Sequence, residues 1–249
     1  MTTFVVAHGA WSAGWAWKHL RPLMEALGHE LVTPTYTGLG ERSHLASPQV
    51  GLDTHIEDIV NVLVFENLRD VALVAHSYGG MVATGVADRV PERIAELIYL
   101  DAFVPRAGQS LFDLVGAEAA SATRQRARDF DGWRVPPNPL PPDTPQAEVE
   151  WVGDRRQPQP LKAFEMPIEL SAEPRMPRSF VYCTRVPPGD PFRQFFNRAR
   201  SEPGWRDFEL DASHNPHITI PETLARLLDE IVTGARRAID DSGSEERRT

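Results

Sequence analysis

Residues 71–90 read VALVAHSYGGMVATGVADRV, an apolar run followed by a run of small residues. Residues 71–74 are all apolar, as expected for a short strand that is buried on both faces. Gly79 and Gly80 then lead into a segment of small residues, Met81 to Val90, which is the length of a helix, and Pro91 marks its end. The segment therefore predicts a buried strand, a tight turn and a helix.

Ser77 stands on this turn. The surrounding residues 75–79 read AHSYG and match the nucleophile elbow G-x-S-x-G with alanine in the first glycine position. The elbow is so tight that only small side chains fit two residues before and after the serine, and it presents the hydroxyl at a helix N-terminus. A serine that only caps the helix is the alternative. The strand before it and the small residues after it favour a catalytic nucleophile.

The length and composition of the chain predict one domain. The chain has 249 residues, of which 41% are hydrophobic, enough to bury the core of a single α/β domain. We expect that domain to span residues 1–238. Residues 239–249 are charged and contain serine and glycine, so we expect a disordered tail there.

Charge and cysteine content narrow the class of partner and the compartment. The net charge of -9 argues against nucleic acid or an anionic membrane as the partner, since both are bound through basic patches. No apolar run reaches the length of a membrane span, and the N-terminus leads into a strand without a basic region or cleavage signal. The single cysteine, Cys183, cannot form an internal disulfide, which fits a reducing compartment. We therefore expect a cytoplasmic protein that binds a small molecule.

Another apolar strand pattern, residues 4–7, leads directly into residues 8–11, HGAW. In folds with a nucleophile elbow, this position supplies one half of an oxyanion hole. The backbone N–H groups of Ala10 and Tyr78 would then be the two donors to a developing alkoxide. We expect His8 to hold this loop rather than to react.

Helix and strand patterns alternate through the N-terminal half. Apolar residues keep helical spacing over residues 20–27, and residues 30–36 have the pattern of the next strand. Thr54 and Glu57 have the spacing of a capping box at the start of another helix. After the elbow, residues 95–100 again have a strand pattern. Such alternation predicts a mostly parallel sheet flanked by helices, with ligands at the carboxyl ends of its strands.

From about residue 102 to residue 178 the alternation stops and prolines accumulate. Long irregular insertions in compact domains are usually lids or binding loops, and we interpret this one as a cap over the site. It carries too many large apolar side chains for a disordered linker. We assign substrate contacts to Trp133 and Trp151 of the cap and to Trp11. For Trp11, packing in the core is the alternative.

His214 is the expected general base. Strand patterns at residues 179–184 and 205–210 precede it, and it follows the serine in the chain order of this type of site. His217 is the rival. The two histidines could also hold a metal, but no carboxylate or cysteine at ligand spacing accompanies them, so we expect no metal.

Several motifs together resemble the α/β-hydrolase superfamily. They are HGAW at residues 8–11, AHSYGGM at 75–81, FVP at 103–105, CT at 183–184, and His214 placed seven residues before Pro221. Over about residues 4–232 the chain is similar to the branch that contains plant methylesterases, hydroxynitrile lyases and bacterial esterase-like relatives. The resemblance implies the α/β-hydrolase fold, a Ser-His-acid triad, esterase-type chemistry, no cofactor and, in many members, a homodimer. It also favours His214 over His217.

One position departs from the pattern of that branch. Its triad acid follows the Cys-Thr pair by two residues, and here that place is held by Val186, which cannot orient an imidazole. Asp101 stands at the end of the strand that follows the elbow, an alternative location known in some lipases of the fold. Asp190, on a loop rich in proline and glycine, is the other candidate. We favour Asp101.

Three classes of function fit these residues. The first is hydrolysis of a carboxylic ester, thioester or lactone of a small to medium apolar substrate through an acyl-enzyme. The second is cofactor-free acid–base chemistry of the lyase, cyclase or oxygenase type. Cyanohydrin cleavage is disfavoured, because those lyases carry a lysine where this chain has Asn215. The third, a non-enzymatic ligand receptor, is disfavoured by the intact elbow and histidine.

Overall fold

The computed structural model describes residues 1–186 and 189–245. Its centre is a six-stranded sheet whose strands all run parallel, in the order β2-β1-β3-β4-β7-β8. The strands are β1 (Thr3–Ala7), β2 (Glu30–Val32), β3 (Val71–His76), β4 (Ile94–Leu100), β7 (Arg178–Cys183) and β8 (Trp205–Leu210). The predicted parallel α/β sheet is confirmed, and β3 and β4 lie at its middle.

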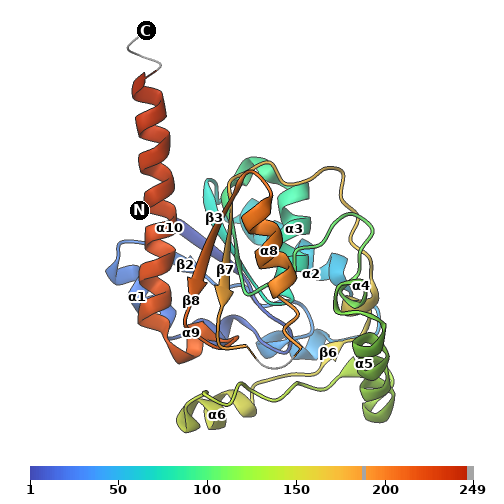
Figure 1. Ribbon diagram of the computed structural model, residues 1–249. Coiled ribbons are helices and arrows are strands. Elements are labelled where there is room, and N and C mark those ends of the chain that lie inside the picture. The colour runs from blue at the N-terminus through green and yellow to red at the C-terminus, as the bar shows by residue number, and fades with distance from the viewer. Residues whose placement is uncertain (187–188, 246–249) are drawn as a thin grey trace.

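Helices cover both faces of this sheet (Figure 1). They are α1 (Leu20–Ala26) and α10 (Pro221–Glu245) on one face, and α2 (Leu52–Phe65), α3 (Gly79–Arg89) and α8 (Arg193–Ser201) on the other. Successive residues of a strand point to opposite faces. In β1, Phe4 and Val6 therefore pack with α1 and α10, whereas Val5 and Ala7 pack with α2 and α3. The apolar runs in the sequence thus serve two cores.

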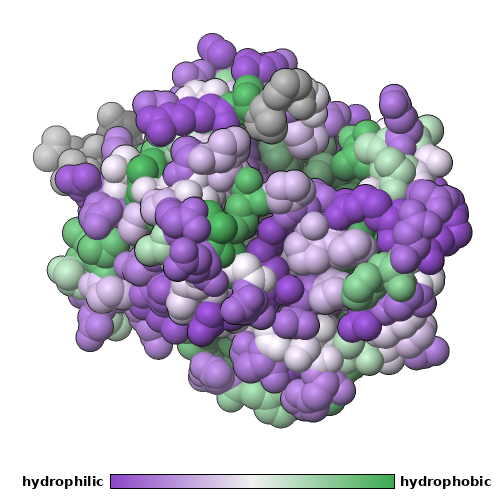
Figure 2. Space-filling model, turned by 90° about the horizontal axis from the view of Figure 1, so that it is seen from below, coloured by the Kyte–Doolittle hydropathy of each residue, from purple (hydrophilic) through white to green (hydrophobic). Residues whose placement is uncertain are grey.

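The segment predicted as a cap lies beyond the carboxyl ends of the strands, toward which the arrows of β7 and β8 point (Figure 1). Its elements are α4 (Leu111–Val115), α5 (Ala117–Phe130), β5 (Arg134–Val135), α6 (Gln146–Gly153), β6 (Gln159–Pro160) and α7 (Lys162–Glu165). Phe112, Val135 and Phe164 are buried in the same core as α2 and α3. The surface on this side is largely hydrophilic, with apolar residues scattered over it (Figure 2). The cap therefore turns much of its apolar surface inward.

Short helical turns occupy several of the connections. They are η1 (Gly14–Trp17), η2 (Gly40–Leu45), η3 (Pro91–Arg93) and α9 (Pro216–Thr219). The first and the last of these lie against each other near the end of the sheet that faces the cap. They place aromatic residues close to the site described below.

The strand predicted over residues 30–36 is shorter than expected, since β2 ends at Val32. Pro34 has no backbone N–H to donate to a neighbouring strand, so the ladder stops before it. The chain then turns inward, and the N–H of Tyr36 donates to Nε2 of His8 at 3.2 Å. Tyr36, which the sequence predicted to be part of this strand, therefore helps to hold the loop after β1.

Helix α2 does not begin at the predicted capping box. It starts at Leu52, after an extended Gly51, and Thr54 lies in its first turn. The Thr54 hydroxyl accepts the Gly51 N–H at 3.4 Å, while Glu57 points outward and pairs with Arg89 at 3.1 Å. The helix is therefore capped by the side chain inside it rather than by the residue before it.

Part of the tail that the sequence predicts to be disordered, residues 239–245, is drawn as helix. Helix α10 continues to Glu245, and the last residues, 246–249, lie outside the described residues. Extending an existing helix adds one hydrogen bond per residue without a new nucleation step, so a polar tail can continue an amphipathic helix. Figure 1 shows this end of α10 projecting away from the sheet. In the described part of the chain, no helix is both long and apolar enough to cross a membrane.

Candidate active site

The turn between β3 and α3 carries Ser77 at the end of the sheet that faces the cap. Its φ of 56° lies in the left-handed region, which a residue other than glycine adopts only where the surrounding structure enforces it. A β-carbon on Gly79 would lie 2.0 Å from the carbonyl oxygen of Ala7, and one on Gly80 would lie 1.9 Å from that of Phe103. The two glycines therefore let the turn press against β1 and the loop after β4. This is the strand-turn-helix geometry of a nucleophile elbow.

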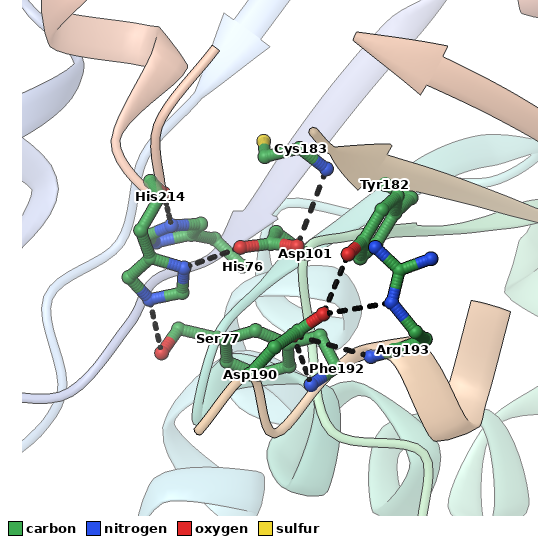
Figure 3. A network of polar contacts seen from close by, with 9 residues as sticks. All are labelled: His76, Ser77, Asp101, Tyr182, Cys183, Asp190, Phe192, Arg193 and His214. Atoms are coloured by element: carbon green, nitrogen blue, oxygen red, sulfur yellow. Dashed lines mark hydrogen bonds and ion pairs between the residues drawn. The ribbon is translucent and has the colours of Figure 1, made fainter. Parts of the chain in front are cut away.

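Ser77, His214 and Asp101 lie within hydrogen-bond reach of one another (Figure 3). Nε2 of His214 is 2.9 Å from Oγ of Ser77, and Nδ1 of His214 is 2.7 Å from a carboxylate oxygen of Asp101. Each residue comes from the carboxyl end of a different strand: β3, β8 and β4. A parallel sheet brings these ends to one edge, where ligands bind in open α/β folds.

Asp101 is nearly inaccessible to solvent, with 2% of its surface exposed. Burial raises the pKa of its carboxyl group, and the hydrogen bonds from His214 and from the Cys183 N–H oppose that rise. A carboxylate only accepts hydrogen bonds, so it holds the imidazole proton on Nδ1. Nε2 is then free to accept the proton of the Ser77 hydroxyl. This arrangement suits a general base.

The alternative acid, Asp190, is engaged elsewhere (Figure 3). It accepts hydrogen bonds from the Tyr182 hydroxyl at 2.5 Å and from the Phe192 N–H at 2.9 Å, and it pairs with Arg193. Within the described part of the chain it makes no hydrogen bond or ion pair with His214. The structure thus brings Asp101, rather than Asp190, to the histidine.

Two residues that were not assigned from the sequence hold His214 in place. Nε2–H of His76 donates to the carbonyl oxygen of His214 at 2.7 Å, and the Phe192 ring stacks on the imidazole with centroids 4.9 Å apart. Burial, followed by the nearby His214, lowers the pKa of His76 well below its ordinary value, so it stays neutral. His76 is visible in the sequence as the second residue of the elbow. Its partner lies 138 residues away, a contact that no local pattern reveals.

The other two histidines near the site make structural contacts. His217, the rival base, stacks on Trp17 with centroids 4.4 Å apart and makes no hydrogen bond to Ser77 in the described part of the chain. His8 accepts the N–H of Tyr36, so it holds the loop after β1 as the sequence predicts. No group of three or more His, Cys, Asp or Glu side chains among the described residues is placed to hold a metal ion.

The buried neutral histidines predict that stability falls in acid. Burial lowers the pKa of His8 and of His217 to about 3, against 6.5 for an exposed histidine. The unfolded chain therefore binds more protons between these values. Their contribution to the free energy of unfolding is complete above pH 6.5 and falls toward pH 3, by up to about 1.4 kcal/mol per pH unit for each residue.

Melting temperatures measured between pH 8 and about pH 4 would check this expectation. We expect the melting temperature to drop below pH 6.5 in the wild type. His217→Phe keeps an aromatic ring against Trp17 and removes one titrating group, so it should flatten the drop. A variant with the same slope as the wild type would show that His217 does not contribute in this way.

Ala10 and Tyr78, the residues predicted to supply the oxyanion donors, both line the cavity that contains Ser77. Neither N–H donates to another group in the described part of the chain. Two unused donors near a nucleophile are what an oxyanion hole requires.

The next residue, Trp11, is held in place by the cap, because its N–H donates to the Gln159 side chain at 3.2 Å and its indole N–H donates to the Val135 carbonyl oxygen at 2.8 Å. Strands β5 and β6 therefore fix the loop that carries the Ala10 amide.

A cavity of about 860 Å³ lies between the ends of the strands and the cap. Its wall includes Ser77, His214 and Asp101, and Val186 also faces it, at the place where the resembling branch carries its acid. Aromatic side chains from the body and the cap make much of the rest. They include Trp11, Trp15, Phe103, Phe112, Phe164 and Phe192. The site is therefore a largely apolar chamber with Ser77 in its wall.

Trp133 and Trp151, predicted to contact the substrate, do not line this cavity. Trp151 packs edge-on against Trp15 with centroids 5.1 Å apart, and the ammonium group of Lys18 lies over its ring. Trp133 has the guanidinium group of Arg134 over its ring. The composition of the cap shows that it carries aromatic side chains, but only its folded path shows which of them face inward. Phe112 and Phe164 of the cap line the cavity instead.

A parallel sheet with an elbow serine, a histidine after the last strand and a carboxylate at a strand end defines the α/β-hydrolase class. The chain belongs to the Alpha/beta hydrolase family, whose model matches residues 4–227.

Known relatives place the chain within this class. It is 38% identical over 240 residues to the carbendazim hydrolyzing esterase of Nocardioides sp. (strain SG-4G), covering 92% of this chain and 98% of that protein. Methylesterase 8 of Arabidopsis thaliana is 27% identical over 103 residues, which is 41% of this chain and 38% of that protein.

A solved structure agrees. An extracellular α/β-hydrolase from a Paenibacillus species, described as sharing structural and functional homology with tobacco salicylic acid binding protein 2, matches with a TM-score of 0.79 and 25% identity. The match covers 92% of this chain and 98% of that one. The predicted resemblance to the methylesterase branch is confirmed, and the protein is an enzyme of the ester-hydrolase type.

Proposed function

We propose that this enzyme hydrolyses carboxylic esters through a covalent acyl-enzyme on Ser77. The observation that carries the proposal is the hydrogen-bonded series Ser77, His214 and Asp101 in the wall of an apolar cavity. A serine hydroxyl is a weak nucleophile at neutral pH, and an adjacent general base activates it. Here the base is in turn oriented by a buried carboxylate.

The steps follow from this geometry. His214 Nε2 takes the hydroxyl proton while Ser77 Oγ forms a bond to the ester carbonyl carbon. The oxyanion that develops accepts hydrogen bonds from the Ala10 and Tyr78 amides. His214 then gives the proton to the departing alcohol as the C–O bond breaks. A water molecule, deprotonated by the same nitrogen, releases the acid and restores the serine, while Asp101 stabilises the imidazolium in both halves.

The cavity indicates a small to medium substrate with a largely apolar body. Its volume of about 860 Å³ falls in the range typical of small-molecule sites. Carbendazim, the compound in the name of the 38%-identical relative, is a first substrate to test beside simple aryl and alkyl esters. Thioesters and lactones pass through the same steps and belong to the same panel.

An active-site-directed fluorophosphonate tests the nucleophile. We expect it to label the wild-type enzyme at Ser77 and to abolish esterase activity in proportion to the label, because the activated hydroxyl attacks phosphorus as it would a carbonyl. Ser77→Ala should not be labelled. Ser213→Ala removes another serine of the cavity wall and should still be labelled. Label retained by Ser77→Ala would show that the nucleophile is another residue.

A further inference from the structure

Carboxylate and guanidinium side chains in the cavity wall are paired, with one exception. The paired groups are Asp101 with His214, Asp190 with Arg193, and Arg185 with both Asp143 and Asp211. Arg156, on the loop between α6 and β6, also lines the wall. Among residues 1–186 and 189–234, whose side chains the structure describes, it has no carboxylate partner. The cavity therefore contains a cation without a counter-charge.

The contacts of Arg156 hold it in place but leave most of its donors unused. One nitrogen donates to the carbonyl oxygen of Asn138, and the guanidinium carbon lies 5.9 Å from the centre of the Trp11 ring. A guanidinium group has five N–H donors, and the described residues offer it no further acceptor. Burial lowers the pKa of Arg156 to about 10, so the group stays charged at neutral pH.

A partly buried cation without a counter-charge is unfavourable, and a ligand that supplies an anion recovers that free energy. We infer that Arg156 binds a carboxylate carried by the substrate, so that the enzyme prefers esters that also carry one free carboxylate group. The planar fork of the guanidinium group matches a carboxylate with two parallel hydrogen bonds. The inference rests on the proposed ester hydrolysis. Because Arg156 lies against Trp11, the residue after Ala10, the free carboxylate lies on the oxyanion side of the cavity.

Half-esters of straight-chain dicarboxylic acids test this inference. Each monomethyl ester is compared with its dimethyl ester, and kcat/KM is measured across increasing chain length. In the wild type, the ratio of half-ester to diester should peak at the length that spans Ser77 and Arg156. Arg156→Gln removes the charge and should lower kcat/KM for that half-ester at least about tenfold, the effect of losing a charge-assisted hydrogen bond. The readout is the ratio of kcat/KM for the half-ester to kcat/KM for the diester within each variant, so a general change in activity cancels.

Arg155→Gln is the matched control. Arg155 is the neighbouring residue, is exposed, and lies over the Trp151 ring outside the cavity. This variant should keep the peak. The same ratio of half-ester to diester in Arg156→Gln as in the wild type would overturn the inference, as would loss of the peak in Arg155→Gln.

Binding separates this inference from the proposed function. In Ser77→Ala, quenching of tryptophan fluorescence from Trp11 and Trp15 reports occupancy of the cavity without turnover. The half-ester at the peak should bind more tightly than its diester, and adding Arg156→Gln should remove the difference. Equal binding of both esters, with normal hydrolysis of the diester, would overturn the role of Arg156 and leave the proposed ester hydrolysis intact. Charge-dependent binding without hydrolysis of either ester would support Arg156 and contradict the proposed function.

Discussion

Ser77→Ala is expected to lower kcat for ester hydrolysis by about a millionfold, the effect of removing the nucleophile of a Ser-His-Asp site. Without the hydroxyl no acyl-enzyme forms, and only the oxyanion donors and the binding cavity still favour the reaction with water. The measurement is steady-state hydrolysis of p-nitrophenyl butyrate at high enzyme concentration. The melting temperature should stay near that of the wild type, which separates a loss of chemistry from a loss of fold.

A small effect of this change would be informative. If Ser77→Ala kept more than about a tenth of the wild-type kcat, the route through a serine ester would be excluded, because removal of a nucleophile costs orders of magnitude. Expressing the variant in a second host and purifying it on an unused column would exclude contaminating esterases as the source of that activity.

Asp101→Asn is expected to lower kcat by about 10⁴ on the best ester while the protein stays folded. An amide has the shape of a carboxylate, but it carries no charge to stabilise the imidazolium. Its NH₂ group can also donate to Nδ1 of His214, which would leave the proton on Nε2 and block proton transfer from Ser77. The measurement is kcat on the same ester, with the melting temperature as the check on folding.

Asp190→Asn is the control for this prediction. Asp190 bonds Tyr182 and Phe192 rather than the histidine, so its loss should affect kcat far less than the loss of Asp101 does. A larger loss from Asp190→Asn than from Asp101→Asn would place the acid on the loop after β7. If neither change lowered kcat, the enzyme would work with a Ser-His dyad.

The elbow was predictable from sequence because its determinants are local. The strand pattern, the small residues around Ser77 and the helix after it occupy one continuous stretch of chain, and Gly79 and Gly80 are needed for contacts that only this turn makes. The alternation of strands and helices was predictable for the same reason. It depends on periodicities within each element, which tertiary packing preserves.

The acid was harder to predict, because the place that the resembling branch uses is held here by Val186. Asp101 could be proposed only from its position at the end of a strand, since parallel strands bring their carboxyl ends together. The contacts of His76 and Phe192 with His214 join segments far apart in the chain, so no spacing in the sequence points to them.

The cap was predictable in outline but not in detail. Its prolines and aromatic residues indicate a folded insertion, and they carry no period that tells which side chains face the cavity. Trp133 and Trp151 were therefore assigned to the substrate site on composition, whereas the structure places them outside it. Arg156 had no distinguishing signal at all, because an unpaired charge is recognised only when its surroundings are known.

Mass spectrometry of the enzyme quenched with acid during turnover of a slowly hydrolysed ester tests the central claim most directly. We predict that the intact protein gains the mass of the acyl group, that the gain maps to the peptide containing Ser77, and that one equivalent of alcohol is released in an initial burst. Product formation at the full rate with no acyl group on Ser77 and no burst would contradict the acyl-enzyme. That result would favour chemistry in which the serine and histidine act only as acid and base.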